Sequence, residues 1–207
     1  MKTLDHPNIV EYYQTDLSDD YSSFDVLLEY VPGQTLRQLL SNQPLAEADI
    51  KFFSRQLLEG LAYLHANGVI HRDLKSANVL ITPARDLKLV DFGSSRHFKE
   101  DELALTQSLK GSPFWMAPEV ALRHGHSYCC DIWSFGCILV ESLAGSPPWS
   151  EKSWIAGEVL ALLRTEGNLP TIPACSPALH ELITQCLQRD PDARPSAAAL
   201  LEMAFFR

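Results

Sequence analysis

The stretch HRDLKSAN at residues 71–78 decides how the rest of the chain is interpreted. Short apolar runs flank it at residues 69–70 and 79–81, and each run is too short for a helix but long enough for a small strand. The polar stretch between them is therefore predicted to be a loop. Asn78 follows Asp73 by five positions, which lets a loop direct a carboxylate and an amide oxygen into one site.

A second carboxylate follows at Asp91, in the triplet DFG at residues 91–93. An apolar run at residues 87–90 precedes it, after a polar turn at residues 82–86. Two short strands joined by this turn would return Asp91 to the site that holds Asp73 and Asn78. Carboxylate and amide oxygens are the ligands that Mg²⁺ prefers, and a carboxylate such as Asp73 can accept a proton from a hydroxyl group.

These segments resemble those of the protein kinases. Residues 71–78 fit the pattern HRDLxxxN at every fixed position, and DFG and then APE (residues 117–119) follow in the same order. The resemblance implies ATP and Mg²⁺ as cofactors, with Asp73 orienting the attacking hydroxyl group and Asn78 and Asp91 binding the metal. Lys75 would contact the transferred phosphate, as it does in kinases that act on serine and threonine.

The run GSPFWMAPE at residues 111–119 narrows the resemblance. It is similar to the GTPYWMAPE run of the sterile-type serine/threonine kinases, which include MAP kinase kinase kinases and p21-activated kinases. Ser112 stands where that family has a threonine whose hydroxyl contacts the catalytic aspartate and lysine, and the same role is expected because the hydroxyl is kept. The resemblance implies a protein substrate, a place in a signalling cascade and room for an upstream activating kinase.

Residues 28–31, LEYV, resemble the gatekeeper and hinge of the kinase nucleotide site. Leu28 would be the gatekeeper, and the backbone groups of Glu29 and Val31 would hydrogen-bond adenine. Leu80 would pack beneath the adenine ring, although a plain role in the strand core is equally consistent with its sequence context.

Three further positions have structural roles in the family. DIWSFG at residues 131–136 resembles the start of a long buried helix, in which Asp131 would hold the backbone of the loop at residues 71–78. Asp131 is alternatively a helix N-cap. Arg194 would pair with Glu119 inside the protein, and a bidentate pair of this kind fixes geometry more than it adds stability.

Residues 91–119 are polar and aperiodic, which predicts a long functional loop. Arg72 precedes the catalytic aspartate, and in many kinases that arginine binds a phosphorylated loop and orders it. Ser108 is the first candidate for phosphorylation and Thr106 the second. Both are equally consistent with ordinary polar loop residues.

The patterns predict an α+β, mainly helical fold, a kinase C-lobe with remnant N-lobe strands and hinge. Residues 8–14 and 24–31 are expected to form a hairpin around a polar turn at residues 15–23. Apolar residues recur every three or four positions from Ile50 to Leu64, and the Asn67-Gly68 pair should end that helix. Other expected helices run from the Thr35 cap through Leu40, and over residues 132–143, 154–163, 178–187 and 196–205.

The resemblance divides the chain into two parts. Residues 1–31 would be the remnant of the N-lobe, with the end of a helix, two strands and the start of the hinge. Residues 32–207 would be the C-lobe, with the activation segment at residues 91–119.

The composition disfavours several other classes of protein. A net charge of -9 argues against nucleic-acid binding and anionic membranes, and no apolar run is long enough for a membrane span. The start of the chain lacks a secretory leader, so the five cysteines are read as reduced thiols and the location as cytoplasmic. A metal site at residues 124, 126, 129 and 130 is disfavoured, because adjacent cysteines do not match structural zinc spacing.

The front half of an ATP cradle is missing from the sequence. A glycine-rich loop, a VAIK lysine and a helical glutamate would complete it, and no glycine occurs before Gly33. The chain is therefore expected to be N-terminally truncated, with Met1 internal or misassigned, and to be weak or inactive by itself. It should also expose apolar surface. The alternative is a non-catalytic, kinase-like docking or regulatory module.

Overall fold

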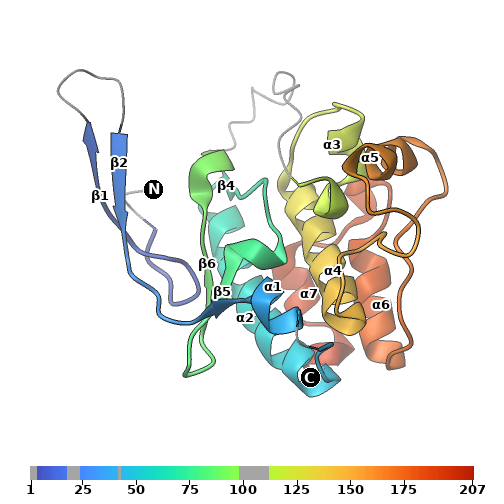
Figure 1. The fold of residues 1–207 in the computed structure, drawn as a ribbon, viewed down its shortest axis with the longest axis horizontal. Helices are drawn as coiled ribbons and strands as arrows, with labels where there is room; N and C mark the ends of the chain where they lie inside the picture. Colours follow the sequence, from blue (N-terminus) through green and yellow to red (C-terminus); the bar gives the residue numbers. More distant parts are fainter. Residues whose placement is uncertain (1–3, 18–23, 42, 98–111) are drawn as a thin grey trace.

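The computed structural model describes residues 4–17, 24–41, 43–97 and 112–207. A two-stranded hairpin near the N-terminus stands apart from a body made mostly of helices, with short strands along the side that faces the hairpin (Figure 1). This arrangement confirms the predicted α+β, mainly helical class.

The hairpin pairs β1 (Tyr12–Leu17) with β2 (Phe24–Leu28) in antiparallel register. The prediction of a strand from residue 8 is wrong. The buried residues Ile9 and Val10 face the body, and their segment pairs with Leu89 there, through Val10 N to Leu89 O at 2.9 Å. The predicted turn also begins too early, since residues 15–17 belong to β1. Exposed apolar side chains on and beside the hairpin are Tyr13, Val26, Leu27 and Tyr30.

The body begins with β3 (Gln34–Thr35) and the short helix α1 (Leu36–Leu40). Thr35 caps α1 as predicted, because its side chain accepts from Gln38 N while the Gln38 side chain accepts from Thr35 N. The long helix α2 (Glu47–Ala66) confirms the next prediction and extends a few residues beyond it at both ends. Asn67 is its C-cap, and Gly68 follows with φ of +73°, a conformation that glycine adopts without a steric penalty.

Two small sheets position the loops of interest. The first has the order β3-β5-β6, with β5 (Val79–Ile81) and β6 (Leu87–Leu89) joined by the predicted polar turn. The second pairs β4 (Val69–Ile70) with β7 (Arg96–His97). The strand β7 was not predicted, because two residues carry no periodic signal and the strand depends on pairing with a distant segment.

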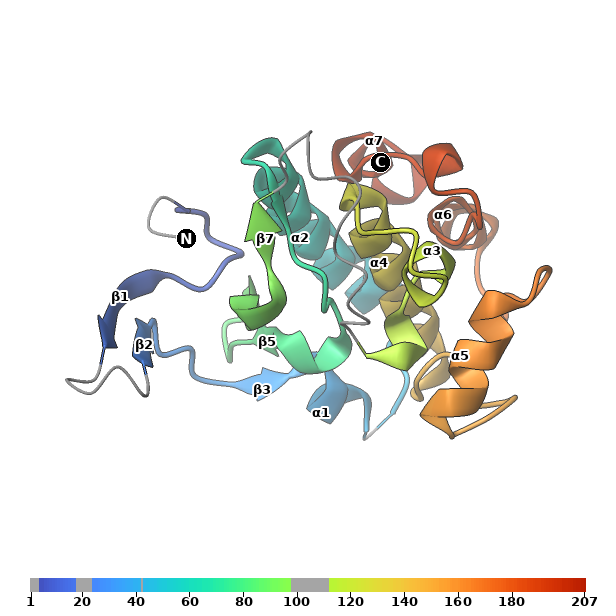
Figure 2. The same ribbon diagram turned by 90° about the horizontal axis from the view of Figure 1, so that it is seen from above.

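Helices make up the remainder of the body. They are α3 (Pro118–Ala121), α4 (Tyr128–Ala144), α5 (Ala156–Arg164), α6 (Pro177–Cys186) and α7 (Ala197–Leu201). Figure 2 shows α4 in the middle of the body, between α2 and α6. One continuous helix over residues 196–205 is wrong. The chain leaves α7 so that Phe205 and Phe206 can enter the core, where the Arg55 guanidinium lies 5.3 Å from the Phe206 ring.

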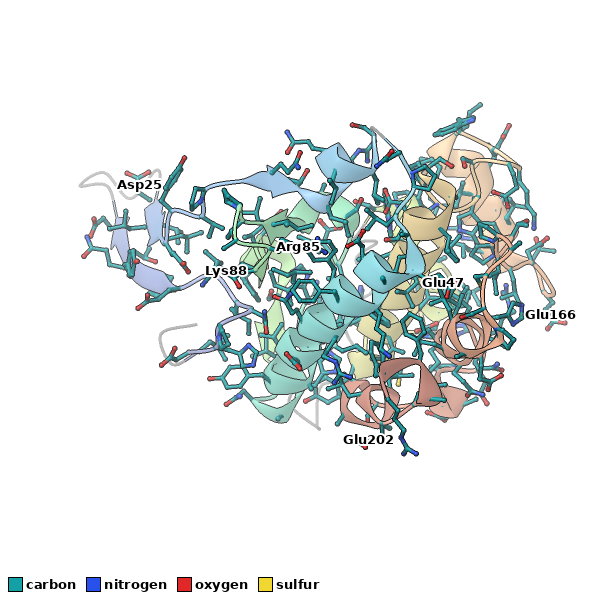
Figure 3. All side chains as sticks on the ribbon, turned by 90° about the horizontal axis from the view of Figure 1, so that it is seen from below. Asp25, Glu47, Arg85, Lys88, Glu166 and Glu202 are labelled. Atoms are coloured by element: carbon teal, nitrogen blue, oxygen red, sulfur yellow. The ribbon has the colours of Figure 1, made fainter. Side chains whose placement is uncertain are left out.

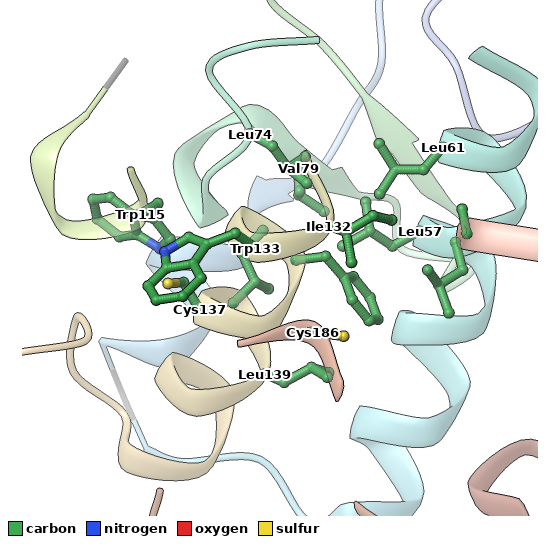
Figure 4. Close-up of a cluster of buried hydrophobic side chains, with 14 of the residues drawn as sticks. Leu57, Leu61, Leu74, Val79, Trp115, Ile132, Trp133, Cys137, Leu139 and Cys186 are labelled. Atoms are coloured by element: carbon green, nitrogen blue, oxygen red, sulfur yellow. The ribbon is translucent and has the colours of Figure 1, made fainter. Parts of the chain in front are cut away.

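The hydrophobic core surrounds α4. Leu57 and Leu61 of α2 lie near Ile132 of α4, and the next residue, Trp133, is completely buried (Figure 4). Burial of a large apolar side chain contributes about 1.5–3 kcal/mol. The helices α4 and α6 approach so closely that a Cβ added at Gly136 would lie 2.7 Å from Cys186 Cβ.

All five cysteines are free thiols. Burial raises the pKa of the Cys130, Cys137 and Cys186 thiols, which keeps them protonated as packing residues.

No helix in the described ranges is both long enough and apolar enough to span a membrane. Charged side chains such as Glu166 and Glu202 lie at the edge of the body (Figure 3).

Candidate active site

Asp73, Lys75 and Ser112 form one hydrogen-bonded cluster. Lys75 Nζ donates to Asp73 Oδ2 at 2.7 Å and to Ser112 Oγ at 2.9 Å. The Ser112 hydroxyl in turn donates to Asp73 Oδ1 at 3.2 Å. The Asp73 and Lys75 side chains are 14% and 21% exposed, so a reactant can reach them from solvent. The cluster places a carboxylate base beside a fixed positive charge.

The pairing of β5 with β6 places Asn78, just before β5, and Asp91, just after β6, at the same end of the sheet. Asn78 Nδ2 donates to the carbonyl oxygen of Asp73 at 2.9 Å, which leaves the amide oxygen of Asn78 as an acceptor. Val90 N donates to Asn78 O at 3.0 Å, so the residue before Asp91 is bound to Asn78. Asp91 is exposed and has φ of +64°, a strained conformation of the kind found at functional sites. These oxygen donors fit a hard cation such as Mg²⁺.

Asp131 holds the start of the loop at residues 71–78. Its Oδ2 and Oδ1 atoms accept from the backbone N–H groups of His71 and Arg72, both at 2.9 Å. Arg72 has φ of +71°, and these bonds stabilise that uncommon backbone conformation. The N-cap of α4 is Ser127 rather than Asp131, which lies in the first turn, so the N-cap alternative is wrong.

The environment keeps Asp131 ionised. Burial acts to raise its pKa. The hydrogen bond and charge of His65 act to lower it, and His65 Nε2 lies 2.9 Å from Asp131 Oδ2. His71 and the Arg72 N–H group also act to lower it. The pKa of Asp131 is lowered as a result.

His71 links the two loops of the site, a role that sequence reasoning did not assign to it. Its Nε2 bonds to Val90 O at 3.1 Å, and because a carbonyl only accepts, Nε2 carries the proton. Nδ1 is then the acceptor for Asp73 N at 3.4 Å. The His71 ring also lies 5.2 Å from the Phe92 ring.

Glu119 and Arg194 form a bidentate ion pair. Arg194 Nη1 and Nη2 donate to the two carboxylate oxygens at 2.6 and 2.7 Å, and the Arg194 side chain is completely buried. Arg194 also donates to the carbonyl groups of Gln188 and Cys129. The pair therefore ties α3 to the start of α4 and to the segment after α6.

The residues expected around a nucleotide lie at the end of β2, directly after it, and in β5. Leu28 ends β2 and packs against the core, as does Val31. Leu80 points to the opposite face of β5 from the buried Val79 and Ile81, and is less buried than either. It therefore leaves apolar surface on the face away from the core.

Glu29 connects the hairpin to β6. Its carboxylate accepts from Lys88 Nζ at 2.8 Å, and Lys88 lies on the side of the body that faces the hairpin (Figure 3). Glu29 N donates to Glu11 O at 2.9 Å, so the pairing of the hairpin continues one residue beyond β2.

Other predicted positions fall outside this cluster. Thr106 and Ser108 lie outside the described residues, and the Arg72 residue is 8% exposed. Within the described ranges, no group of three or more His, Cys, Asp or Glu residues is arranged to hold a metal ion. At the disfavoured metal site, Cys130 instead lies in the core beside Asp131.

Sequence reasoning also missed Glu141. This residue of α4 is 1% exposed and accepts hydrogen bonds from Ser76 Oγ at 2.7 Å and Trp115 Nε1 at 2.9 Å. The available signal was a single charged residue within the mostly apolar run at residues 132–144. That signal identifies an unusual position but not its partners.

Comparison with known proteins shows extended similarity. The family model described as "Protein kinase domain" matches residues 1–206. Mitogen-activated protein kinase kinase kinase 3 of Arabidopsis thaliana is 43% identical over 209 residues, which cover 99% of this chain and 32% of the relative. Mitogen-activated protein kinase kinase kinase ANP1 of the same plant is 40% identical over 207 residues, covering 99% of this chain and 31% of the relative.

A relative from a different group of organisms is similar as well. Mitogen-activated protein kinase kinase kinase A of Dictyostelium discoideum is 41% identical over 207 residues, covering 99% of this chain and 22% of the relative. The chain thus spans about a third or less of the length of these curated relatives.

Proposed function

Because this chain belongs to the protein kinase family, we propose that it carries the phosphoryl-transfer site of a serine/threonine kinase of the MAP kinase kinase kinase type. The proposed reaction moves the γ-phosphate of ATP to a serine or threonine hydroxyl group of a protein substrate. The cluster of Asp73, Lys75 and Ser112 is the observation that carries the proposal, because it pairs a base with a positive charge at hydrogen-bond distances.

Each member of the cluster has a separate role. Asp73 orients the incoming hydroxyl group and accepts its proton. Lys75 supplies positive charge next to the phosphoryl oxygens, where negative charge has to be stabilised during transfer. Ser112 bonds to both side chains and so keeps the base and the charge in one arrangement. Positioning and electrostatic stabilisation together account for most of the catalysis of phosphoryl transfer.

Asn78 and Asp91 are the proposed ligands of Mg²⁺. Bound Mg²⁺ would neutralise charge on the nucleotide phosphates. The exposed Asp91 carboxylate and the amide oxygen of Asn78 support this assignment, because both are hard oxygen donors and Asn78 is bonded to Asp73.

The nucleotide base is proposed to lie between the hairpin and β5. Leu28 would border it, Leu80 would pack beneath it, and backbone groups of Glu29 and Val31 would hydrogen-bond it. The half-buried position of Leu80, on the face of β5 away from the core, supports this placement. Residues 1–31 would then belong to the N-lobe and residues 32–207 to the C-lobe.

Regulation, partners and location are proposed from the relatives and the residues together. The names of the relatives favour a MAP kinase kinase as the protein substrate.

Phosphorylation of Ser108, or else of Thr106, would create an anion for Arg72 to bind. Activity that is unchanged in Ser108→Ala and in Thr106→Ala would contradict this step. Five free cysteines favour a reducing compartment such as the cytoplasm.

A non-catalytic docking module is the weaker alternative. Such a module has no need of Asp73, Lys75, Asn78 and Asp91, and the structure brings the first three into direct contact. The retained cluster therefore favours the enzyme.

The experiment is a phosphorylation assay with analysis of the modified residue. Because the chain spans only part of its relatives, the assay uses the full-length protein with Mg²⁺, ATP and a MAP kinase kinase as substrate. Phosphoserine or phosphothreonine on the substrate is expected. Phosphotyrosine alone, or no transfer by the full-length protein, would contradict the proposal.

A further inference from the structure

Glu141 is a buried carboxylate with one side-chain donor on each oxygen. Ser76 Oγ lies 2.7 Å from Oε1, and Trp115 Nε1 lies 2.9 Å from Oε2. The glutamate is 1% exposed, Ser76 is 0% exposed and Trp115 is 3% exposed, so the whole bridge is shielded from solvent. Figure 4 shows Trp115 reaching toward α4, beside Trp133.

A carboxylate at this position is costly for the fold. Its neighbours Ile138, Leu139 and Val140 are buried apolar residues, and removing a carboxylate from water is unfavourable unless hydrogen bonds or charges compensate. Burial raises the pKa of Glu141, while the bonds from Ser76 and Trp115 and the charge of Arg37 act against the rise. An apolar side chain would serve packing alone, so the glutamate is explained better by what it connects.

The two donors belong to the two segments that build the active site. Ser76 follows Lys75 directly and begins the short turn Ser76–Asn78. Trp115 ends the short turn Pro113–Trp115, which follows Ser112 directly. The carbonyl of Trp115 also accepts from Ser134 Oγ of α4 at 2.8 Å. Both segments are therefore fastened to the same central helix within a few residues of the Lys75–Ser112 contact.

We propose that Glu141 is a positioning residue for phosphoryl transfer, which holds the Ser112 segment in register with the loop that carries Asp73 and Lys75. This inference rests on the proposed function. The carboxylate acts through Ser76 and Trp115 and does not itself touch the reactants. Its two oxygens set the separation of the segments, so the loss of either donor loosens both of them.

Hydrogen exchange tests the bridge without relying on activity. In the full-length protein, Ser76→Ala is expected to increase amide exchange in residues 114–117, although the substitution lies in the other segment. Trp115→Phe, which keeps an aromatic ring but loses the N–H donor and part of the indole volume, is expected to increase exchange in residues 74–78. Changes confined to the substituted segment in each variant would overturn the bridge.

Ser142→Ala is a matched control. Ser142 is the next residue of α4, is 4% exposed and also has a buried hydroxyl, but this hydroxyl donates to Ile138 O within the same helix. Its substitution removes a buried hydrogen bond and leaves both active-site segments attached. Exchange in residues 74–78 and 114–117 is expected to stay at the wild-type level.

Kinetics test whether the bridge matters for transfer. Ser76→Ala, Trp115→Phe and Glu141→Ala are each expected to lower kcat/KM for the protein substrate by roughly tenfold, the effect of losing a buried hydrogen bond to a charged group. Glu141→Gln can accept from Trp115 and donate to the Ser76 hydroxyl, so it should recover most of the loss seen with alanine. Partial rescue by glutamine separates positioning from a general loss of packing.

The outcomes separate this inference from the function on which it rests. A full-length wild-type protein that transfers no phosphate would overturn the proposed function and this inference together. An active wild type whose Ser76, Trp115 and Glu141 variants behave like Ser142→Ala would overturn the inference alone. Loss in those variants with rescue in Glu141→Gln supports it.

Discussion

The Ser112 hydroxyl donates to the carboxylate of Asp73 across 39 positions of sequence, with Oγ and Oδ1 3.2 Å apart. The bond joins the segment that leads into α3 to the loop between β4 and β5. Lys75 Nζ contacts both residues, so each of the three side chains is bonded to the other two.

Replacement of Ser112 tests this arrangement. Ser112→Ala should lower kcat roughly tenfold or more, because a hydrogen bond to a charged group is worth about 1.5–3 kcal/mol. The KM for ATP should change little, since Asn78 and Asp91 keep their positions. Ser112→Thr restores the hydroxyl and should recover most of the rate in steady-state assays. Equal losses in the alanine and threonine variants would show that the hydroxyl is not the active feature.

Asp131 should give the fold an acid-sensitive contribution. Its pKa is lowered in the folded state from the ordinary value of 3.8, so this contribution is present above that value and is lost as the pH falls through the folded pKa. Asp131→Asn should reduce the free energy of unfolding by about 1–3 kcal/mol at neutral pH, because an amide can accept from only one of the two N–H groups.

Urea unfolding over a series of pH values measures the Asp131 effect. The difference between wild type and Asp131→Asn should narrow as the pH drops below 3.8. A difference that stays constant across the series would contradict an ionised Asp131 as the stabilising group.

Glu141 should show the opposite pH dependence. Burial raises its pKa above the ordinary value of 4.5, so the protonated form favours the folded state and stability falls as the pH rises through the folded pKa. Glu141→Gln removes this ionisation and keeps both hydrogen bonds. The variant should therefore gain free energy of unfolding relative to wild type as the pH rises from 4.5 to neutral. A variant that becomes relatively less stable over that range would refute the raised pKa.

The Glu119–Arg194 pair should be far more important for stability than an exposed pair. Glu119→Gln leaves the fully buried Arg194 without its charge partner, and breaking a buried pair in this way costs about 3–5 kcal/mol. The matched control is Asp49→Asn, which breaks the pair with Arg85 on the surface, where the side chains are 38% and 54% exposed. That change should cost at most about 1 kcal/mol. Similar losses in thermal or urea unfolding would contradict this ranking.

Local signals in the sequence predicted much of the framework. The spacing of apolar residues and the Asn67-Gly68 pair located α2 closely, and the Thr35 cap located α1. Predictions failed where distant contacts override local preference. Residues 8–10 pair with β6 instead of extending the hairpin, and β7 exists only through its pairing with β4.

The candidate active site shows the same difference between local signals and distant contacts. The motifs identified Asp73, Lys75 and Asn78, but the choice between two roles for Asp131 depended on its contact with backbone groups 59 and 60 positions earlier. Glu141 was visible only as an isolated acid in an apolar helix. Its partners lie 65 and 26 positions away, which no local pattern encodes.

The most direct test of Asp73 as the general base compares phosphate transfer from ATP to a protein substrate by full-length wild-type protein and its Asp73→Asn variant. We expect phosphoserine or phosphothreonine formation by the wild type and a loss of at least about 100-fold in kcat in the variant, since a general base is removed. ATP binding should persist in the variant. Equal rates of transfer by the two proteins would contradict the assignment of Asp73 and, with it, the proposed active site.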